Sequence, residues 1–234
     1  MWRLILLSLL ALANVSPSII SLYHFDGEYL RRIQAKDVNI TDMQSYSDIE
    51  DDGLRGEVLC VQADGEGVRV KVCAEDSADA TWQSPAGWLV KEIVFSDLNL
   101  DGQEELSLLV WRPFQPWPVD RFLPNGGRIA SFHDEHNMSC HLILIGLVDG
   151  KIRELWAGSA LVDPIRELRA TDLDGDGLQE LAALEYAYDA DPLRASLTVW
   201  SWNGFGFSLQ ARQAGRFSSL LVLPAESGNV LLAH

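Results

Sequence analysis

The chain has 234 residues, of which 47% are hydrophobic, so it can bury one sizeable core or two small ones. Its formal net charge is −16 and its isoelectric point lies near 4.5. Nucleic acid and anionic lipid are both bound by basic surfaces, so this charge argues against either, and no nucleic-acid partner is expected.

The chain begins with an apolar run. Arg3 precedes the run Leu4–Ala13, which ends in small residues of the kind found at cleavage sites. The run has about ten residues, whereas a membrane-spanning helix needs about twenty. Residues 1–17 are therefore predicted to be a signal peptide. Two alternatives stay open: an uncleaved anchor, in which residues 4–22 tether the protein to a membrane, and a buried strand of a chain that starts upstream.

Four segments are predicted to form β-hairpins. In each, alternating apolar residues run into an Asp-Gly or Asn-Gly turn and then resume, and this is the strongest short-range hairpin signal. The segments are residues 20–33, 58–72, 142–155 and 197–210. Trp156, Trp200 and Trp202 fall in hairpin strands, where they are predicted to pack between neighbouring structural units.

The three cysteines form no CxxC motif. Cys60 and Cys73 flank the turn of the second hairpin, so a disulfide between neighbouring strands is one interpretation. Free buried thiols are the interpretation favoured for all three residues, Cys140 included.

Two acidic segments, residues 90–106 and 165–181, align without gaps. Each carries a basic residue, a glutamate and an aliphatic residue, followed by Ser/Thr-Asp-Leu and an acidic turn. Residues 47–58 form a weaker third copy. That copy has Gly56 where the returning carboxylate should stand, so it is expected to be empty.

The spacing of the acidic residues suits a divalent cation. Carboxylates at alternate positions of a tight turn converge on one point and repel one another, unless a cation such as Ca²⁺ collects their oxygens. In the second segment, Asp172, Asp174 and Asp176 would supply side-chain oxygens. Leu178 would supply a backbone carbonyl, and Glu180 would return as a further carboxylate.

The first segment offers the corresponding ligands Asp97, Asn99, Asp101, Gln103 and Glu105. Asn99 is neutral, so weaker binding is expected there. Mg²⁺ or Mn²⁺ would find the same ligands. The alternative is a turn without metal, in which backbone amides satisfy the carboxylates.

An EF-hand is excluded as the source of these loops. It requires a glutamate at position twelve and flanking helices. Here Leu108 and Ala183 stand at that position, and the flanking residues are β-like.

A proline- and glycine-rich stretch, residues 111–141, is predicted to be an inserted loop. Phe114, Trp117 and Phe122 lie on its stiff first part and are the predicted contact surface for another protein. Packing of this loop over the rest of the fold is the alternative.

The end of the same stretch contains His133, His136, Cys140 and His141, which could ligate zinc. No second matching pair of ligands is present, so a solvated polar loop that leads into a strand is the favoured interpretation.

The acidic loops resemble the calcium loop of the FG-GAP/VCBS-type repeat, the blade of integrin-α-like propellers, which reads Asp-x-Asp/Asn-x-Asp-Gly-x-x-Asp/Glu-Leu. The resemblance implies an all-β fold for residues 18–234, built as β-propeller-like blades of short antiparallel strands with calcium as a structural staple. The Phe-Gly and Gly-Ala-Pro elements of the family are missing, and Trp-x-Trp-Asn-Gly (200–204) stands in the corresponding hairpin. With three acidic loops, the propeller is expected to be small, incomplete or open.

The resemblance also implies a function in adhesion or protein binding. The predicted function is a non-catalytic, calcium-stabilised module for protein binding or structural support outside the cytoplasm, either secreted, periplasmic or membrane-anchored. Two alternatives are a hydrolase of glycans or phosphoesters on a propeller-like scaffold and an accessory subunit of a membrane complex. The sequence contains no GxSxG, P-loop, HExxH or GxGxxG motif, and no catalytic residue is assigned.

Overall fold

The computed structural model describes residues 21–34, 54–55, 59–64, 67–73, 80–116, 131–189, 194–225 and 229–233. These residues form sixteen β-strands and no α-helix, arranged as four antiparallel four-stranded sheets. The predicted all-β fold class is therefore confirmed. Within this part of the chain no helix is long and apolar enough to cross a membrane. The predicted signal peptide, residues 1–17, lies outside the described residues.

Each of the first three sheets takes four consecutive strands of the chain in sequence order. Sheet 1 contains β3 (Leu54–Arg55), β4 (Leu59–Asp64), β5 (Gly67–Val72) and β6 (Thr81–Gln83). Sheet 2 contains β7 (Leu89–Ser96), β8 (Glu105–Pro113), β9 (Met138–Val148) and β10 (Lys151–Ala157). Sheet 3 contains β11 (Ile165–Thr171), β12 (Glu180–Tyr186), β13 (Arg194–Trp202) and β14 (Phe207–Arg216).

Sheet 4 joins strands that lie near opposite ends of the sequence. Its order is β15 (Leu220–Leu223), β16 (Val230–Ala233), β1 (Ser21–Phe25) and β2 (Leu30–Ile33). The link is the antiparallel pairing of β16 with β1, in which Tyr23 lies opposite Leu231.

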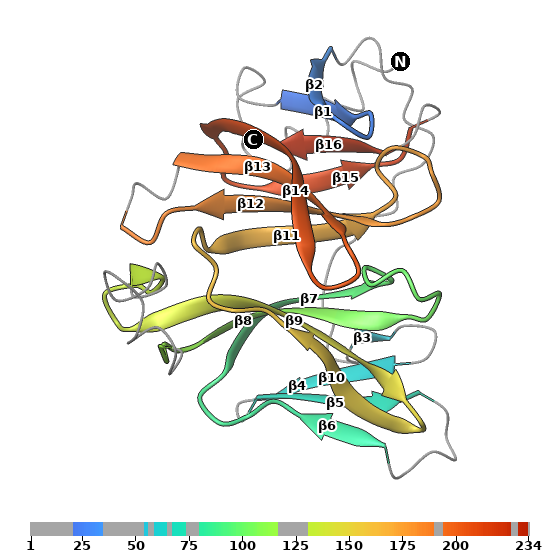
Figure 1. The fold of residues 1–234 in the computed structure, drawn as a ribbon, viewed down its shortest axis with the longest axis vertical. Coiled ribbons are helices and arrows are strands. Elements are labelled where there is room, and N and C mark those ends of the chain that lie inside the picture. The colour runs from blue at the N-terminus through green and yellow to red at the C-terminus, as the bar shows by residue number, and fades with distance from the viewer. Residues whose placement is uncertain are drawn as a thin grey trace.

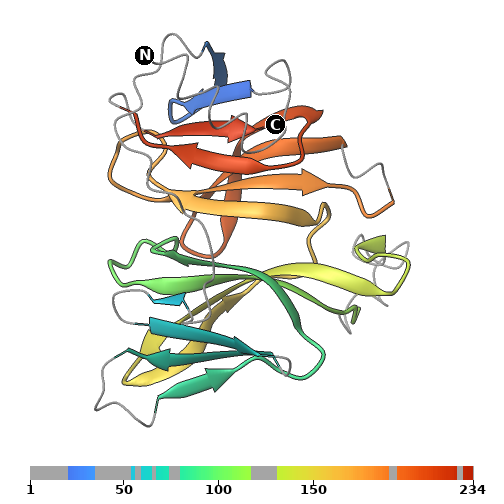
Figure 2. The same cartoon turned by 180° about the vertical axis from the view of Figure 1, so that it is seen from behind.

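The four sheets follow one another along the long axis of the molecule in the order 4, 3, 2, 1 (Figures 1 and 2). The first strand of one sheet contacts the first strand of the next, since β15 contacts β11 and β11 contacts β7. Sheets 2 and 3 are therefore covered on both faces. Their central strands β8 and β12 are buried at successive positions, which explains why they have continuous apolar runs instead of alternation.

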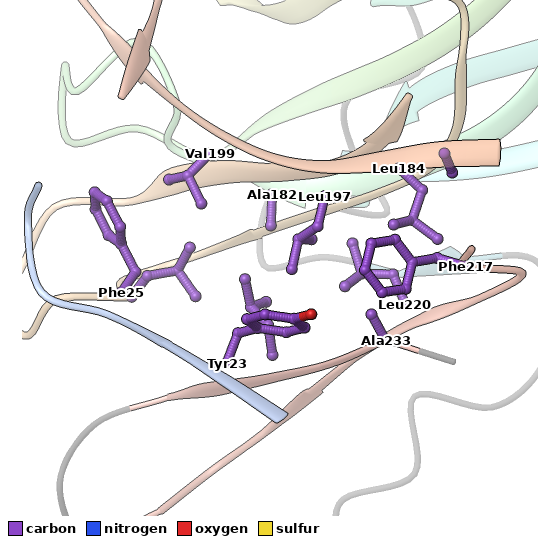
Figure 3. Packing of buried hydrophobic residues seen from close by; sticks show 12 residues of the cluster. Tyr23, Phe25, Ala182, Leu184, Leu197, Val199, Phe217, Leu220 and Ala233 are labelled. Carbon is purple, nitrogen blue, oxygen red and sulfur yellow. The ribbon is translucent and has the colours of Figure 1, made fainter. Parts of the chain in front are cut away.

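Most of the apolar core lies in the interfaces between sheets, and a smaller cluster lies on the face of sheet 4 that points away from sheet 3. Figure 3 shows the cluster between sheets 3 and 4, where Tyr23 and Phe25 face Leu197 and Val199. The ring of Phe217 packs edge-on against Tyr23, with 6.1 Å between the ring centroids. Two further clusters fill the interfaces between sheets 1 and 2 and between sheets 2 and 3.

The predicted packing of tryptophans between structural units is confirmed at the interface of sheets 2 and 3. Trp156 of β10 lies against Trp202 and Phe207 of sheet 3, with ring centroids 5.9 and 5.4 Å away. Trp200 packs against the same apolar cluster.

All four predicted hairpins are confirmed as β1–β2, β4–β5, β9–β10 and β13–β14. The turn of β9–β10 places both Asp149 (φ 51°) and Gly150 (φ 71°) in the left-handed region, as this two-residue turn requires. The β4–β5 hairpin differs in position. It joins the second and third strands of its sheet, whereas the other three join the third and fourth.

The favoured prediction of free thiols is wrong for two of the cysteines. Cys60 and Cys73 form a disulfide with 5.1 Å between their Cα atoms, and Cys140 is free and buried. The strand register explains the bond. Because Cys60 lies opposite Lys71, Cys73 falls on the same face one diagonal position away.

The predicted insertion is shorter than residues 111–141. Strand β8 continues to Pro113 and β9 begins at Met138, and these two residues pair with each other. Of the connection between them, residues 114–116 and 131–137 are described, and they contain no strand. Pro113 is tolerated because it stands where the ladder of hydrogen bonds ends.

Candidate metal centre

The two acidic segments occupy equivalent places in neighbouring sheets. The Asp97 loop (residues 97–105) connects β7 to β8, the first two strands of sheet 2. The Asp172 loop (residues 172–180) connects β11 to β12, the first two strands of sheet 3. The weaker third copy, residues 47–58, contains β3, and the rest of it lies outside the described residues.

A network of side-chain to backbone hydrogen bonds holds the Asp172 loop. The carboxylate of Asp172 accepts from the N–H of Gly175 (2.6 Å) and of Gly177 (3.0 Å). Asp174 accepts from the N–H of Asp176 (3.2 Å). Both glycines have positive φ, 85° and 90°, so the chain can turn back on itself within a few residues.

This turn brings three carboxylates together. Asp172, Asp174 and Asp176 each offer an oxygen within 4.8 Å of the others. Two oxygens on opposite sides of a Ca²⁺ ion lie about 4.6–5.2 Å apart, since each Ca–O distance is about 2.3–2.6 Å. The spacing of the three side chains therefore fits a hard divalent cation, with the Leu178 carbonyl as a further predicted ligand.

Glu180 closes the Asp172 loop from its buried side. Its Oε2 accepts from the backbone N–H of Leu173 (2.8 Å), whose side chain is fully buried. Burial raises the pKa of Glu180 to about 7, and the charges of Asp174, Asp176 and Asp172 act in the same direction. Without a cation, the loop holds this glutamate partly protonated at neutral pH.

The Asp97 loop has a nearly identical network. Asp97 accepts from the N–H of Asp101 (3.0 Å) and of Gly102 (3.1 Å), and Asp101 accepts from the N–H of Gln103 (2.9 Å). Asn99 takes the place of Asp174 and accepts from the N–H of Asp101 (3.0 Å) through its amide oxygen. The two loops therefore fold the same turn with different numbers of charges.

Glu105 is the most deeply buried acid of the Asp97 loop, with 1% of its surface exposed. Its Oε1 accepts from the N–H groups of Leu98 (2.8 Å) and Asn99 (3.1 Å). Its Oε2 is buried without a hydrogen-bond partner in the described part of the chain. Burial raises the pKa of Glu105 to about 7. A buried oxygen without a partner is costly, and either a proton or a cation would satisfy it.

Each loop also reaches the next sheet through one side chain. Gln179 of the Asp172 loop accepts, through Oε1, from the backbone N–H of Asp97 (2.9 Å). At the equivalent position of the Asp97 loop, Glu104 accepts from the N–H of Leu59 in sheet 1 (3.5 Å). From sheet 4, Asn229 donates to the carbonyl of Asp172 (2.8 Å). The loops therefore link all four sheets in series.

The glutamate that precedes each loop is a second repeated link, and the sequence indicated its presence but not its role. Glu92 of β7 accepts from the N–H of Leu168 in sheet 3 (2.8 Å). Glu167 of β11 accepts from the N–H of Leu220 in sheet 4 (2.8 Å). Both glutamates stand at β-bulges, which turn their side chains toward the neighbouring sheet. The signal in the sequence was their constant distance from the acidic turn.

The predicted contact surface lies only in part within the described residues. Phe114 is half-buried and packs against the ring of His133, with 5.0 Å between the ring centroids. Trp117 and Phe122 lie outside the described residues. Their role in protein binding stays a prediction.

The histidines and cysteine near residue 140 are not brought together as a zinc site. Over the described ranges, Asp172, Asp174 and Asp176 are the one group of three or more His, Cys, Asp or Glu side chains close enough to share an ion. His136 is exposed, whereas His141 is buried in β9 and contacts Ser139 Oγ through Nε2 (2.8 Å). Burial lowers the pKa of His141 to about 4, so this ring is neutral at neutral pH.

No protein-family model matches the chain, and no curated protein or solved structure shows significant similarity to it. The relation to FG-GAP/VCBS-type repeats therefore depends on the loop residues and stays a proposal.

Proposed function

We propose that the protein is a non-catalytic β-repeat module in which Ca²⁺, held by the Asp172 and Asp97 loops, stabilises a scaffold for binding or supporting another protein. The observation that carries this proposal is the repeated loop. Two turns with nearly the same hydrogen-bond network stand at the same place in adjacent sheets. The Asp172 turn gathers three carboxylates, the Asp97 turn offers two carboxylates and an amide at the same positions, and each turn bonds to the next sheet.

The finer architecture belongs to the same proposal. Each four-stranded sheet would be one blade of a propeller-like array, and sheet 4 would tie the two ends of the chain together. An open or incomplete array is supported by the position of sheets 4 and 1 at opposite ends of the molecule (Figures 1 and 2). Location outside the cytoplasm is supported by the Cys60–Cys73 disulfide, because disulfides persist in oxidising compartments.

Calcium would act by removing repulsion within the loops. The chain carries a formal charge of −16, and its acidic turns lie at the junctions between sheets. Ligand at a hundred times its dissociation constant stabilises the folded state by about 2.7 kcal/mol. For a chain of this size, that corresponds to a rise in the midpoint of thermal unfolding of about 5–10 °C.

The test is thermal unfolding of the wild type with calcium and with chelator, beside two double variants. Asp174→Ala/Asp176→Ala removes two predicted ligands. Glu135→Ala/Glu154→Ala removes two exposed carboxylates elsewhere and is the matched control. Calcium should raise the midpoint of the wild type and the control, and much less that of the ligand variant. Equal midpoints with and without millimolar calcium in all three proteins would refute the proposal.

The hydrolase alternative predicts an exposed group of perturbed carboxylates beside the insertion. Within the described residues the carboxyl groups with raised pKa are Glu92, Glu105, Glu180 and Glu185. All four are buried or half-buried, and each accepts hydrogen bonds that hold the fold together. They give the hydrolase no specific support.

A further inference from the structure

A buried histidine lies at the end of sheet 2 that is remote from the Asp97 loop. His141 of β9 pairs with Val110 of β8, and the ladder between these strands ends three pairs further on, where Pro113 lies opposite Met138. Val110 belongs to the apolar cluster between sheets 1 and 2, so the ring of His141 faces the same interface. With 5% of its surface exposed, His141 is an ionisable residue in a place where a charge is costly.

Both ring nitrogens of His141 have hydrogen-bond partners that suit the neutral ring. Nδ1 lies 3.0 Å from the carbonyl oxygen of Gly158, which can only accept, so Nδ1 carries the hydrogen. Nε2 is then the acceptor, and the hydroxyl of Ser139 donates to it over 2.8 Å. The neutral ring is therefore fully satisfied without water.

The charged group beside the ring is an arginine. The guanidinium of Arg112 on β8 has one nitrogen 3.4 Å from Nδ1 of His141 and lies over the ring of Trp88, with 5.4 Å to the centroid. Glu154 of β10 attracts this guanidinium, and the other partners of the ring, Ser139 and Gly158, are neutral. Among the described residues no carboxylate forms an ion pair with His141, so nothing there offsets a positive charge on the ring.

A proton on His141 would meet an electrostatic obstacle and no hydrogen-bonding one. The Ser139 hydroxyl also lies 3.4 Å from the carbonyl oxygen of Arg112, so it can turn to that acceptor and receive the new Nε2–H. The buried charge beside Arg112 would remain. Burial lowers the pKa of His141 to about 4, and the charge of Arg112 acts in the same direction.

The sign of the effect on stability follows from this direction. The folded arrangement favours the neutral ring, so its contribution is complete above the ordinary value of 6.5 and is lost as the pH falls toward 4. Acid therefore weakens the end of the ladder that His141, Arg112 and Ser139 hold.

We propose that Arg112, Ser139 and His141 form an acid latch, which opens this end of the β8–β9 ladder below about pH 6. The next contact beyond the latch is the hydrogen bond from the Phe114 N–H to the carbonyl oxygen of Asn137 (2.8 Å). Phe114 belongs to the predicted contact surface, so opening the latch would release it from its place beside the sheet. The latch shares no residue with the calcium loops, and a failure of the calcium proposal would leave it untouched.

The test follows the full-length, isotope-labelled protein by magnetic resonance between pH 7 and pH 5. The ring of His141 should stay neutral in the closed protein through this range. The protection of the Phe114 N–H against hydrogen exchange, corrected for the intrinsic rate, should fall about twentyfold, which is the factor that pKa values of about 4 and 6.5 give. Glu105 and Glu180 cannot mimic this result, because their protonation stabilises the fold as the pH falls.

Three variants complete the test. His141→Gln removes the titrating group and should show the same protection at both pH values. Arg112→Gln removes the neighbouring charge and should show a smaller fall than the wild type. His136→Gln changes an exposed histidine of the same connection and is the matched control, which should behave as the wild type does.

The thermal midpoint of each variant at pH 7 shows whether it is folded, and the wild-type results stand even if one variant is not. Equal protection of the Phe114 N–H in the wild type at pH 7 and pH 5 would overturn the proposal. So would a ring of His141 that titrates near 6.5 in the closed protein, or a twentyfold fall that persists in His141→Gln.

Discussion

The Asp172 loop and the Asp97 loop fold the same turn with different chemistry, and the difference separates what the turn needs from what a cation needs. Asn99 accepts the N–H two residues ahead as well as Asp174 does in the other loop. A neutral amide is therefore enough to make the turn. The additional carboxylate at Asp174 adds charge that the turn does not need, and the proposed calcium site would give that charge a role.

The two loops also differ at their tightest point. Leu100 adopts a φ of 61° where the Asp172 loop has Gly175 at 85°. A side chain in this region costs about 1–2 kcal/mol. The Asp97 loop therefore holds a strained residue as well as a buried carboxylate oxygen without a partner, on Glu105. Both features cost free energy, so the folded form of the Asp97 loop depends more on packing against the neighbouring sheets.

The largest expected effect concerns pH, because both loops hold a glutamate with a pKa raised to about 7, Glu105 and Glu180. The protonated form of such a group is favoured by the folded state. Its contribution to stability is complete below the pKa of the unfolded state, near 4.5, and is lost as the pH rises through the folded-state pKa of about 7. In chelator, the free energy of unfolding should therefore fall by about 3 kcal/mol per group at most between pH 5 and pH 8. Urea unfolding at both pH values measures it.

Calcium should cancel most of that loss, because a cation stabilises the ionised form of both glutamates. The double variant Glu105→Gln/Glu180→Gln is the control, and it should lose much less stability over the same window. A wild type that is equally stable at pH 5 and pH 8 in chelator would contradict the burial that raises these pKa values.

Exchanging one charge between the loops should change their calcium affinities in opposite directions. Asn99→Asp should tighten binding at the Asp97 loop about tenfold, and Asp174→Asn should weaken binding at the Asp172 loop by a similar factor, about 1.4 kcal/mol each. Titration calorimetry of both variants measures the change. If neither affinity moves, the side chain at position 99 or 174 is not a ligand in either loop.

Loss of the hydrogen bond between the two loops should destabilise the loop that carries no substitution. Gln179→Ala removes the acceptor of the Asp97 N–H, and an unpaired backbone group costs about 1–2 kcal/mol. Calcium binding at the Asp97 loop should weaken, although the substitution lies in the other loop. Gln103→Ala, which changes an exposed side chain, is the matched control for stability. Equal stability of the two variants would show that the hydrogen bond from the Asp97 N–H to Gln179 does not stabilise the fold.

The smallest expected effect concerns the left-handed position. Gly175→Ala should lower the free energy of unfolding by about 1 kcal/mol, because alanine is strained at a φ of 85°. Leu100→Gly should raise it by less, because glycine loses more chain entropy on folding and leucine loses its packing. Chemical denaturation of the two variants beside the wild type measures the sign of both changes in the free energy of unfolding. A stabilising Gly175→Ala would mean that this part of the turn is not rigid.

Local features of this fold could be predicted from the sequence, because turn chemistry acts over a few residues. The four hairpins and the two acidic turns each depend on an Asp-Gly or Asn-Gly pair, or on a run of alternating acids. Long-range pairing could not be predicted. Nothing in the periodicity of Ser21–Phe25 identifies Val230–Ala233 as its neighbour, and the register that joins Cys60 to Cys73 is set by the pairing of β4 and β5.

The same limit applies to the sites. The predicted ligand positions of the loops follow from spacing alone, but the burial of Glu105 and the link through Gln179 require neighbouring sheets to be in place.

Calcium titration by calorimetry tests the central claim most directly. After treatment with chelator, the wild type should bind two Ca²⁺ ions, the tighter one at the Asp172 loop. Asp176→Ala should abolish the tighter site, and Asp101→Ala should abolish the weaker one. Absence of binding at millimolar calcium, or two sites that survive both substitutions, would show that the repeated acidic turns are not calcium loops.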